Sequence, residues 1–200
     1  MSSAVAGGSR FGVQTRIAWQ NRVMRFETAS DADLAVIAGQ LGREPRGVAG
    51  VAWRCPCGRP GVVATAPRLE PEGTPFPTTY YLTCQRAVAG CSRLEASGLM
   101  SQMKHRLAND PDLRTQYLAA HQAYLADRAG LATQLGVENV PHADVSAGGM
   151  PDRVKCLHAL VGHALAAGLG VNPLGDEAVA ALGAFWDNPC VIDADSGDAQ

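Results

Sequence analysis

The chain has 200 residues, a formal net charge of −2 at pH 7, and 46% hydrophobic and 18% charged residues. This length suits one domain with a buried core, and a charge so close to zero gives no attraction to nucleic acid or to an anionic membrane. No apolar run approaches the roughly 18 residues of a membrane-spanning helix, and no secretory signal is recognisable. We therefore expect a cytoplasmic protein, with no nucleic-acid or membrane partner, whose six cysteines are reduced thiols or ligands.

The composition divides the chain into three parts. Residues 1–23 are rich in Ser, Gly and Ala without periodicity, so we expect a disordered extension and regard Met24 as the natural start. Residues 24–186 carry periodic apolar patterns and are predicted to form a single α+β domain. Residues 187–200 are small and acidic, which is typical of a flexible tail.

The first half of this domain predicts a helix followed by strands. Ser30 and Asp33 have the spacing of a capping box, with an apolar helical stripe behind them that Gly42 ends. Three segments rich in β-forming residues follow, at 48–54, 62–69 and 78–83. The first two are joined by a Gly/Pro turn, so the expected result is a small antiparallel three-stranded sheet within residues 48–84.

The second half has helical patterns. Gly98 bends or ends a first helix, and Asp110 with the proline after it begins a long one. A third long helix is expected over about 151–167, and its residues are apolar on nearly every side, which predicts a central, buried position. A turn at 172–175 leads to a final short helix over 176–186.

Three polarisable side chains lie on the predicted buried helix, namely Cys156, His158 and His163. Buried polar groups need partners, so these residues are candidate metal ligands as well as ordinary core residues. Residues two apart on a regular helix point in nearly opposite directions, and Cys156 and His163 are about 10 Å apart along the axis. A metal ion therefore needs ligands from other segments, or Cys156 must precede the regular helix.

Cys55 and Cys84 are the expected ligands from other segments. Cys55 lies at the hairpin turn and Cys84 at the end of the third strand. Neighbouring strands are about 4.8 Å apart, so the two thiols can meet at one edge of the sheet. Cys55 and Cys57 are separated by one residue rather than the two of the usual zinc knuckle, so this spacing alone does not specify a metal.

A second hypothesis uses the start of the same helix. Gly148 and Gly149 precede it, and Arg153 and Lys155 lie in its first predicted turns. Free backbone N–H groups, the helix dipole and two cations favour an anion such as phosphate. The same field would make Cys156 a candidate catalytic nucleophile. No P-loop or Rossmann spacing is present, so an ordinary loop remains the alternative.

Several segments together resemble an uncharacterised family of bacterial domains of unknown function. The residues that carry the resemblance are Gln40–Gly47, Arg54–Pro56, Pro67–Leu69, Gly73–Thr78, Tyr81–Cys84, Ala147–Ala159, His163 and Gly170–Glu177. The resemblance implies a family common in high-GC Gram-positive bacteria and often encoded near septum-formation-initiator and exopolyphosphatase genes. Some members have His where this chain has Cys84, an exchange that suits a metal ligand. The family has no established activity to transfer.

The leading hypothesis is a metal-binding domain. Zinc comes first, held by Cys55, Cys84 and Cys156 with His158 or His163, and an iron–sulfur cluster comes second. The competing hypothesis is an enzyme with Cys156 as nucleophile and a phosphorylated or carboxylated small-molecule substrate. A third is an interaction module with a protein partner in cell division or polyphosphate metabolism. The sequence leaves open whether the protein is an enzyme.

Overall fold

The structure, a computed structural model, describes residues 26–187. The extension expected at 1–23 and most of the acidic tail expected at 187–200 lie outside these residues. The elements are α1 (Asp31–Leu41), β1 (Val48–Arg54), β2 (Pro60–Thr65), β3 (Arg68–Leu69), β4 (Thr74–Pro75), β5 (Tyr80–Leu82), α2 (Gln85–Ala96), α3 (Leu99–Asn109), α4 (Pro111–Gln134), α5 (Leu157–Ala167), α6 (Pro173–Leu182) and the 3₁₀ turn η1 (Phe185–Asp187). The predicted α+β class is confirmed.

The sheet has the strand order β1-β2-β5, with both pairs antiparallel, as expected. The second strand is shorter than predicted and ends at Thr65, because Pro67 has no N–H to continue the ladder. Residues 68–69 pair instead with 74–75 in a separate two-stranded ribbon. Gly73 has a φ of 66° in the turn of this ribbon, a conformation that favours glycine.

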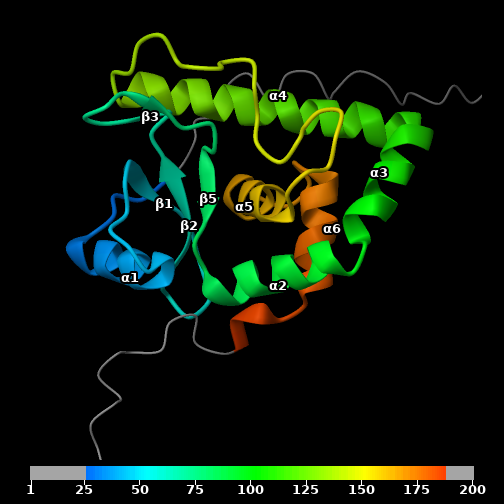
Figure 1. Cartoon of the computed structure of the whole chain (residues 1–200), viewed down its shortest axis with the longest axis horizontal. Coiled ribbons are helices and arrows are strands. Elements are labelled where there is room, and N and C mark those ends of the chain that lie inside the picture. Colours follow the sequence, from blue (N-terminus) through cyan, green and yellow to red (C-terminus); the bar gives the residue numbers. More distant parts are fainter. Residues whose placement is uncertain (1–25, 188–200) are drawn as a thin grey trace, which may run out of the picture.

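Helix α1 is attached to the sheet by charge. Asp33 completes the predicted capping box, since Ser30 Oγ accepts the Asp33 N–H and the Asp33 carboxylate accepts the Ser30 N–H. The guanidinium of Arg54, at the end of β1, donates to both carboxylate oxygens of Asp33 at 2.7 and 3.0 Å. A bidentate pair of this kind fixes orientation as well as distance. The helix lies on the side of the sheet away from α5 (Figure 1).

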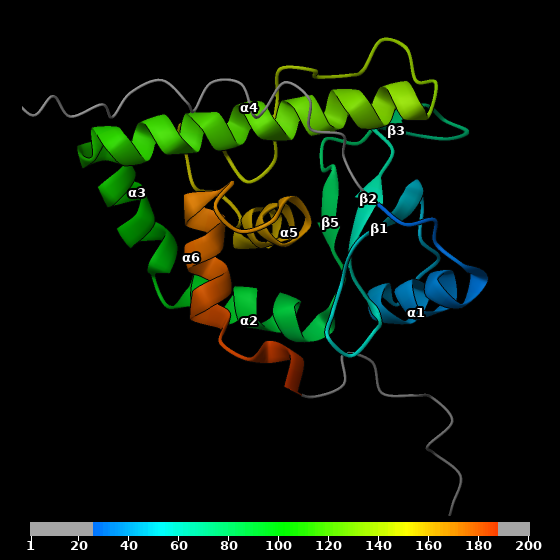
Figure 2. The same ribbon diagram turned by 180° about the vertical axis from the view of Figure 1, so that it is seen from behind.

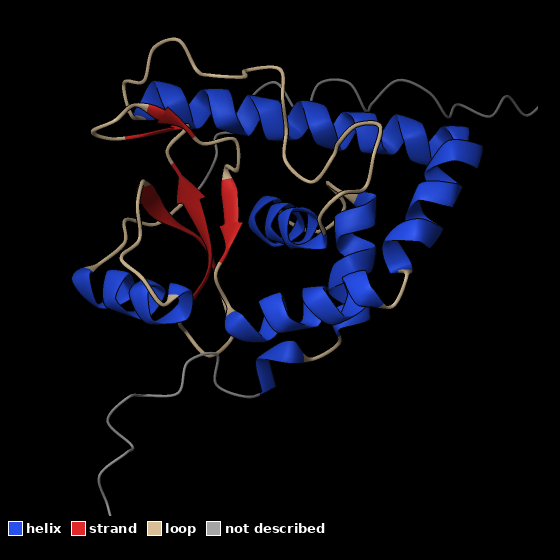
Figure 3. Ribbon diagram, in the orientation of Figure 1, coloured by secondary structure: helices blue, strands red, loops and turns tan. Residues whose placement is uncertain are grey.

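Helix α5 occupies the centre of the molecule. In both Figure 1 and Figure 2 it is surrounded by α2, α3, α4 and α6, with β5 closing the remaining side. Six of its eleven residues are buried, which confirms the predicted central position. Figure 3 shows that long helices form the frame around it. The longest is α4, with 24 residues, and no helix within residues 26–187 is long and apolar enough to cross a membrane.

The central helix begins at Leu157, six residues later than predicted. Residues 148–155 form a closed loop instead, in which the N–H groups of Arg153 and Lys155 donate to the carbonyls of Gly149 and Gly148. Both glycines have positive φ, so the chain turns back on itself before the helix starts. Cys156 is the extended N-cap residue, with φ −155° and ψ 114°.

Helix α6 begins earlier than predicted, at Pro173, because Asn172 is its N-cap and accepts the N–H of Gly175. The turn expected at 172–175 is therefore the first turn of this helix. A Cβ atom at Gly175 would lie 2.5 Å from the carbonyl oxygen of Leu160 and 3.0 Å from Ala164 Cβ. Glycine is needed here because α5 and α6 approach each other closely.

Replacement of this glycine tests the close approach. Gly175→Ala should lower the free energy of unfolding by about 1–3 kcal/mol, because the backbone of α5 must move. The control is Gly130→Ala in α4, where a Cβ meets nothing within 4 Å. This control should stabilise the protein by up to about 1 kcal/mol through helix propensity. Urea unfolding of both variants measures the difference, and equal effects would contradict the packing described.

Candidate metal centre

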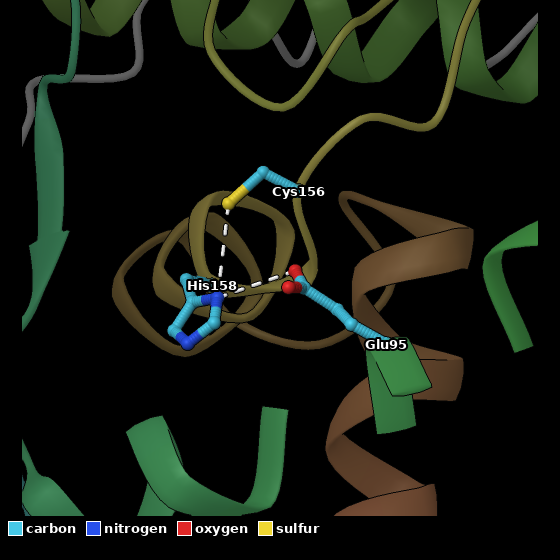
Figure 4. Close-up of side chains that lie close together, drawn as sticks. All are labelled: Glu95, Cys156 and His158. Carbon is cyan, nitrogen blue, oxygen red and sulfur yellow. Dashed lines mark hydrogen bonds and ion pairs between the residues drawn. The ribbon is translucent and has the colours of Figure 1, made fainter. Parts of the chain in front are cut away.

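Three side chains meet where α2 passes the start of α5. His158 Nδ1 lies 3.8 Å from Cys156 Sγ and 3.2 Å from Glu95 Oε1. One ligand atom from each residue lies within 4.8 Å of the other two, and no other group of three within residues 26–187 meets this condition. Figure 4 shows the sulfur, the ring nitrogen and the carboxylate facing one another.

The position of Cys156 explains how residues two apart reach one point. Within a regular helix Cys156 and His158 would point in nearly opposite directions. Cys156 precedes the first helical residue and has extended backbone, so its side chain turns toward the imidazole. This is the arrangement under which the sequence allows both residues to bind one ion.

A hydrogen bond from the second ring nitrogen of His158, Nε2, fixes the tautomer of the neutral ring. Nε2 lies 3.2 Å from the carbonyl oxygen of Val88, which can only accept a hydrogen bond, so Nε2 carries the proton. Ser92 Oγ lies 3.4 Å from the same nitrogen. In the neutral ring Nδ1 then carries a lone pair, which is directed at Glu95 Oε1 and Cys156 Sγ. A histidine that donates its other N–H to a backbone carbonyl is the usual arrangement for a metal ligand.

Glu95 is placed between two helix ends. It lies in the last turn of α2, where the helix dipole disfavours a negative charge. Its Oε1 accepts the N–H of Leu157 at 2.7 Å, so the positive end of α5 compensates. The N-terminus of the central helix is therefore already occupied by a carboxylate of the protein itself.

The two distances from His158 Nδ1 fit a tetrahedral ion. Bonds of about 2.0–2.3 Å in a tetrahedron separate neighbouring ligand atoms by roughly 3.3–3.8 Å. The separations from Nδ1 are 3.2 and 3.8 Å. Glu95 and His158 are each about a quarter exposed, at 25% and 28% of the side chain, so an ion can enter.

The pair of Cys156 and His158 is also electrostatically coupled. Burial raises the pKa of Cys156, but the hydrogen bond from His158, the Ala159 N–H and the imidazolium charge outweigh it, so the net pKa is lowered. The pKa of His158 is raised, chiefly by the hydrogen bond to Cys156. Without a metal, each residue therefore stabilises the charged form of the other.

A cavity of about 340 Å³ opens beside this cluster. Cys156 and His158 form part of its wall, and Tyr80, Tyr81 and Val88 form other parts. A volume of this size accommodates a small ligand. The thiol and the imidazole are thus accessible from one side.

The structure places the other predicted ligands elsewhere. His163 is fully buried, stacked on Tyr80 with ring centroids 5.7 Å apart and edge-on to Tyr124 at 5.2 Å. Its Nδ1 accepts from Asn172 Nδ2 at 3.3 Å. This histidine therefore belongs to an aromatic group of the core, away from Cys156.

Cys55 and Cys84 are both buried at the same end of the sheet. The Cys84 N–H donates to the carbonyl of Gly61, and the Cys55 N–H donates to the carbonyl of Arg59 in the adjoining turn. Neither thiol belongs to the group formed by Glu95 and His158. The two cysteines thus lie near the same turn, as the strand spacing predicts, without joining the candidate centre.

The four residues predicted to bind an anion surround one cavity. Gly148, Gly149, Arg153 and Lys155 all line a hollow of about 460 Å³. They lie ahead of the helix rather than in its first turn, because α5 begins later than expected. The N–H groups of Arg153 and Lys155 are bonded within the loop, so these two groups are not available to an anion.

Comparison with known proteins gives the family. Residues 51–180 match the family described as Protein of unknown function (DUF501), which is more than half of the chain. The chain belongs to the DUF501 family. No curated protein and no solved structure matches it. The DUF501 region contains Glu95, Cys156 and His158, so the whole cluster lies within the part that defines the family.

Glu95 is the member of the cluster that the sequence analysis missed. The sequence feature that could have indicated Glu95 is its place in the last turn of a helix, where the helix dipole disfavours a negative charge. Val88, Ser92 and Glu95 also have the three- and four-residue spacing of one helix face, and all three contact His158. This spacing could not by itself show which helix the face meets.

The coupling of Cys156 to His158 predicts a pH dependence of thiol reactivity in metal-free protein. Because its pKa is lowered, the Cys156 thiolate persists to lower pH than an ordinary thiolate, and alkylation by iodoacetamide should persist with it. In His158→Gln the effect of burial dominates, so the alkylation profile should shift to higher pH. Peptide mass spectrometry at a series of pH values measures this shift.

Cys91 provides the internal control for this experiment. Burial, together with the neighbouring Glu95, Cys156 and Cys84, raises the pKa of Cys91 to about 12. This thiol should stay unmodified at every pH at which the protein is folded. Equal profiles for Cys156 in the wild type and in His158→Gln would contradict the coupling.

Proposed function

We propose that this protein is a zinc-binding domain in which Glu95, Cys156 and His158 hold the ion. The observation that carries the proposal is that two electron-rich atoms, a sulfur and a carboxylate oxygen, face one imidazole nitrogen. Because Nε2 donates its proton to the carbonyl of Val88, Nδ1 of the neutral ring directs a lone pair at the Glu95 carboxylate. This contact is repulsive. A positive charge at this point, either a proton or a metal ion, makes the contact attractive.

The ligand set favours zinc over harder or softer ions. One thiolate, one imidazole and one carboxylate combine donors that zinc accepts together, whereas magnesium and calcium prefer oxygen alone. An iron–sulfur cluster needs more thiolates than this group provides. Zinc is therefore the first candidate for this centre.

The number of ligands indicates an open coordination position. Structural zinc sites have four protein ligands, whereas catalytic sites have three and keep the fourth position for water or substrate. The cavity beside Cys156 and His158 supplies the space for that position. A zinc ion held there by Glu95, Cys156 and His158 would supply Lewis-acid chemistry of the kind used in hydrolysis.

A cysteine-nucleophile enzyme is the second candidate, favoured by the lowered pKa of Cys156. In a triad, the nucleophile and the orienting carboxylate contact different nitrogens of the histidine. Here Cys156 and Glu95 contact the same nitrogen, so Val88 rather than the carboxylate orients the ring. This geometry favours the zinc site over a cysteine-nucleophile enzyme.

Zinc titration of the full chain tests the proposal. The protein, free of any metal-binding tag and stripped with a chelator, should bind about one zinc ion per chain in competition with a chromophoric chelator. Glu95→Gln, Cys156→Ser and His158→Gln should each weaken zinc binding by at least about tenfold, because each removes a ligand. Glu95→Gln still offers an oxygen to the N–H of Leu157, so the start of α5 is retained.

The matched controls are Cys57→Ser and His105→Gln, which remove the same kinds of side chain from exposed positions. Both controls should bind zinc as the wild type does. A wild-type chain that takes up no zinc at micromolar concentration, or controls that weaken binding as much as the cluster variants, would show that these three residues form no zinc site.

A further inference from the structure

A second large hollow lies between α3, α4 and the loop that precedes α5. It has a volume of about 750 Å³. Its wall includes four cationic side chains, Lys104, Arg114, Arg153 and Lys155, and a single carboxylate, that of Asp152. These cations come from three separate segments of the chain, so their convergence is a result of the tertiary fold.

The same hollow has apolar side chains in its wall. Leu107 is 4% exposed and Val154 is fully buried, while Leu118 on α4 leaves 45% of its surface exposed, among the largest exposures of an apolar side chain within residues 26–187. An exposed leucine beside cations presents both an apolar and a charged surface to one ligand. A cavity of about 300–1,000 Å³ with this combination is typical of small-molecule sites.

Arg114 and the backbone of the loop that bears Arg153 and Lys155 are held in place before any ligand binds. Arg114 Nη1 donates to the carbonyl of Ala108 at 2.7 Å, which anchors its guanidinium at the end of α3. Tyr117 donates to the carbonyl of Arg153, and a Cβ at Gly149 would lie 2.8 Å from that same oxygen. The loop bearing Arg153 and Lys155 is thus tightly packed, and preorganisation of this kind reduces the cost of binding.

We propose that this cavity binds a small amphipathic anion, with a phosphate or carboxylate group at the four cations and an apolar body against Leu107, Leu118 and Val154. Guanidinium and ammonium groups are the side chains that bind phosphate and carboxylate. The excess of cations over the one carboxylate supplies the charge complementarity. This site shares no wall residue with the cavity beside Cys156 and His158.

The test uses the full chain and the fluorescent dye 1-anilinonaphthalene-8-sulfonate, which has one anionic group on an apolar body. The double variant Lys104→Gln/Arg153→Gln should weaken dye binding about fivefold or more, because two cations are lost from the wall. The control Arg86→Gln/Arg93→Gln removes the same charge from exposed positions on α2 and should bind the dye as the wild type does. Thermal unfolding checks that both variants are folded.

Competition identifies the ligand class. Hexyl phosphate should displace the dye from the wild type at concentrations about tenfold lower than inorganic phosphate or hexanol, because only hexyl phosphate uses both the cations and the apolar wall. Dye binding that is equal in the two double variants would overturn the proposal. Displacement by hexanol as effective as that by hexyl phosphate would exclude an anion site, and equally effective inorganic phosphate would exclude the amphipathic ligand.

Discussion

The candidate centre depends on one hydrogen bond, from His158 Nε2 to the carbonyl oxygen of Val88. It fixes the orientation and the tautomer of the ring, so that Nδ1 faces Glu95 and Cys156 as a lone pair in the neutral state. A positive charge between the three groups makes both contacts of this nitrogen attractive. Whether that charge is a proton or a metal ion decides between a reactive thiolate and a metal site.

The surrounding fold holds these groups in place through the contact of two helices. Helix α2 presents Val88, Ser92 and Glu95 on one face, and this face meets the first residues of α5. The carboxylate lies where the negative end of one helix approaches the positive end of the other, so a charge unfavourable to α2 is favourable to α5. Helix α5 in turn is fixed by its burial and by its close approach to α6 at Gly175.

Much of the fold follows from local sequence signals. The capping box of Ser30 and Asp33, the long helix that begins after Asp110 and the central helix with apolar residues on nearly every side are all confirmed. The start of α5 could not be predicted by periodicity, because residues 151–155 are compatible with the first turn of a helix but are closed into a loop by backbone hydrogen bonds to Gly148 and Gly149. That later start is what brings Cys156 to His158. The carboxylate of Glu95 comes from a contact between α2 and α5, whose contacting residues are 62 and 63 positions apart, and no local pattern shows such a contact.

X-ray absorption at the zinc edge of the zinc-loaded full chain tests the central claim most directly, because it counts the sulfur ligands. The cluster of Glu95, Cys156 and His158 predicts one sulfur at about 2.3 Å, with nitrogen and oxygen ligands at about 2.0–2.2 Å. Three sulfur ligands would instead indicate a site built from Cys55, Cys84 and Cys156. A first shell of nitrogen and oxygen alone would contradict both arrangements and leave Cys156 outside the metal site.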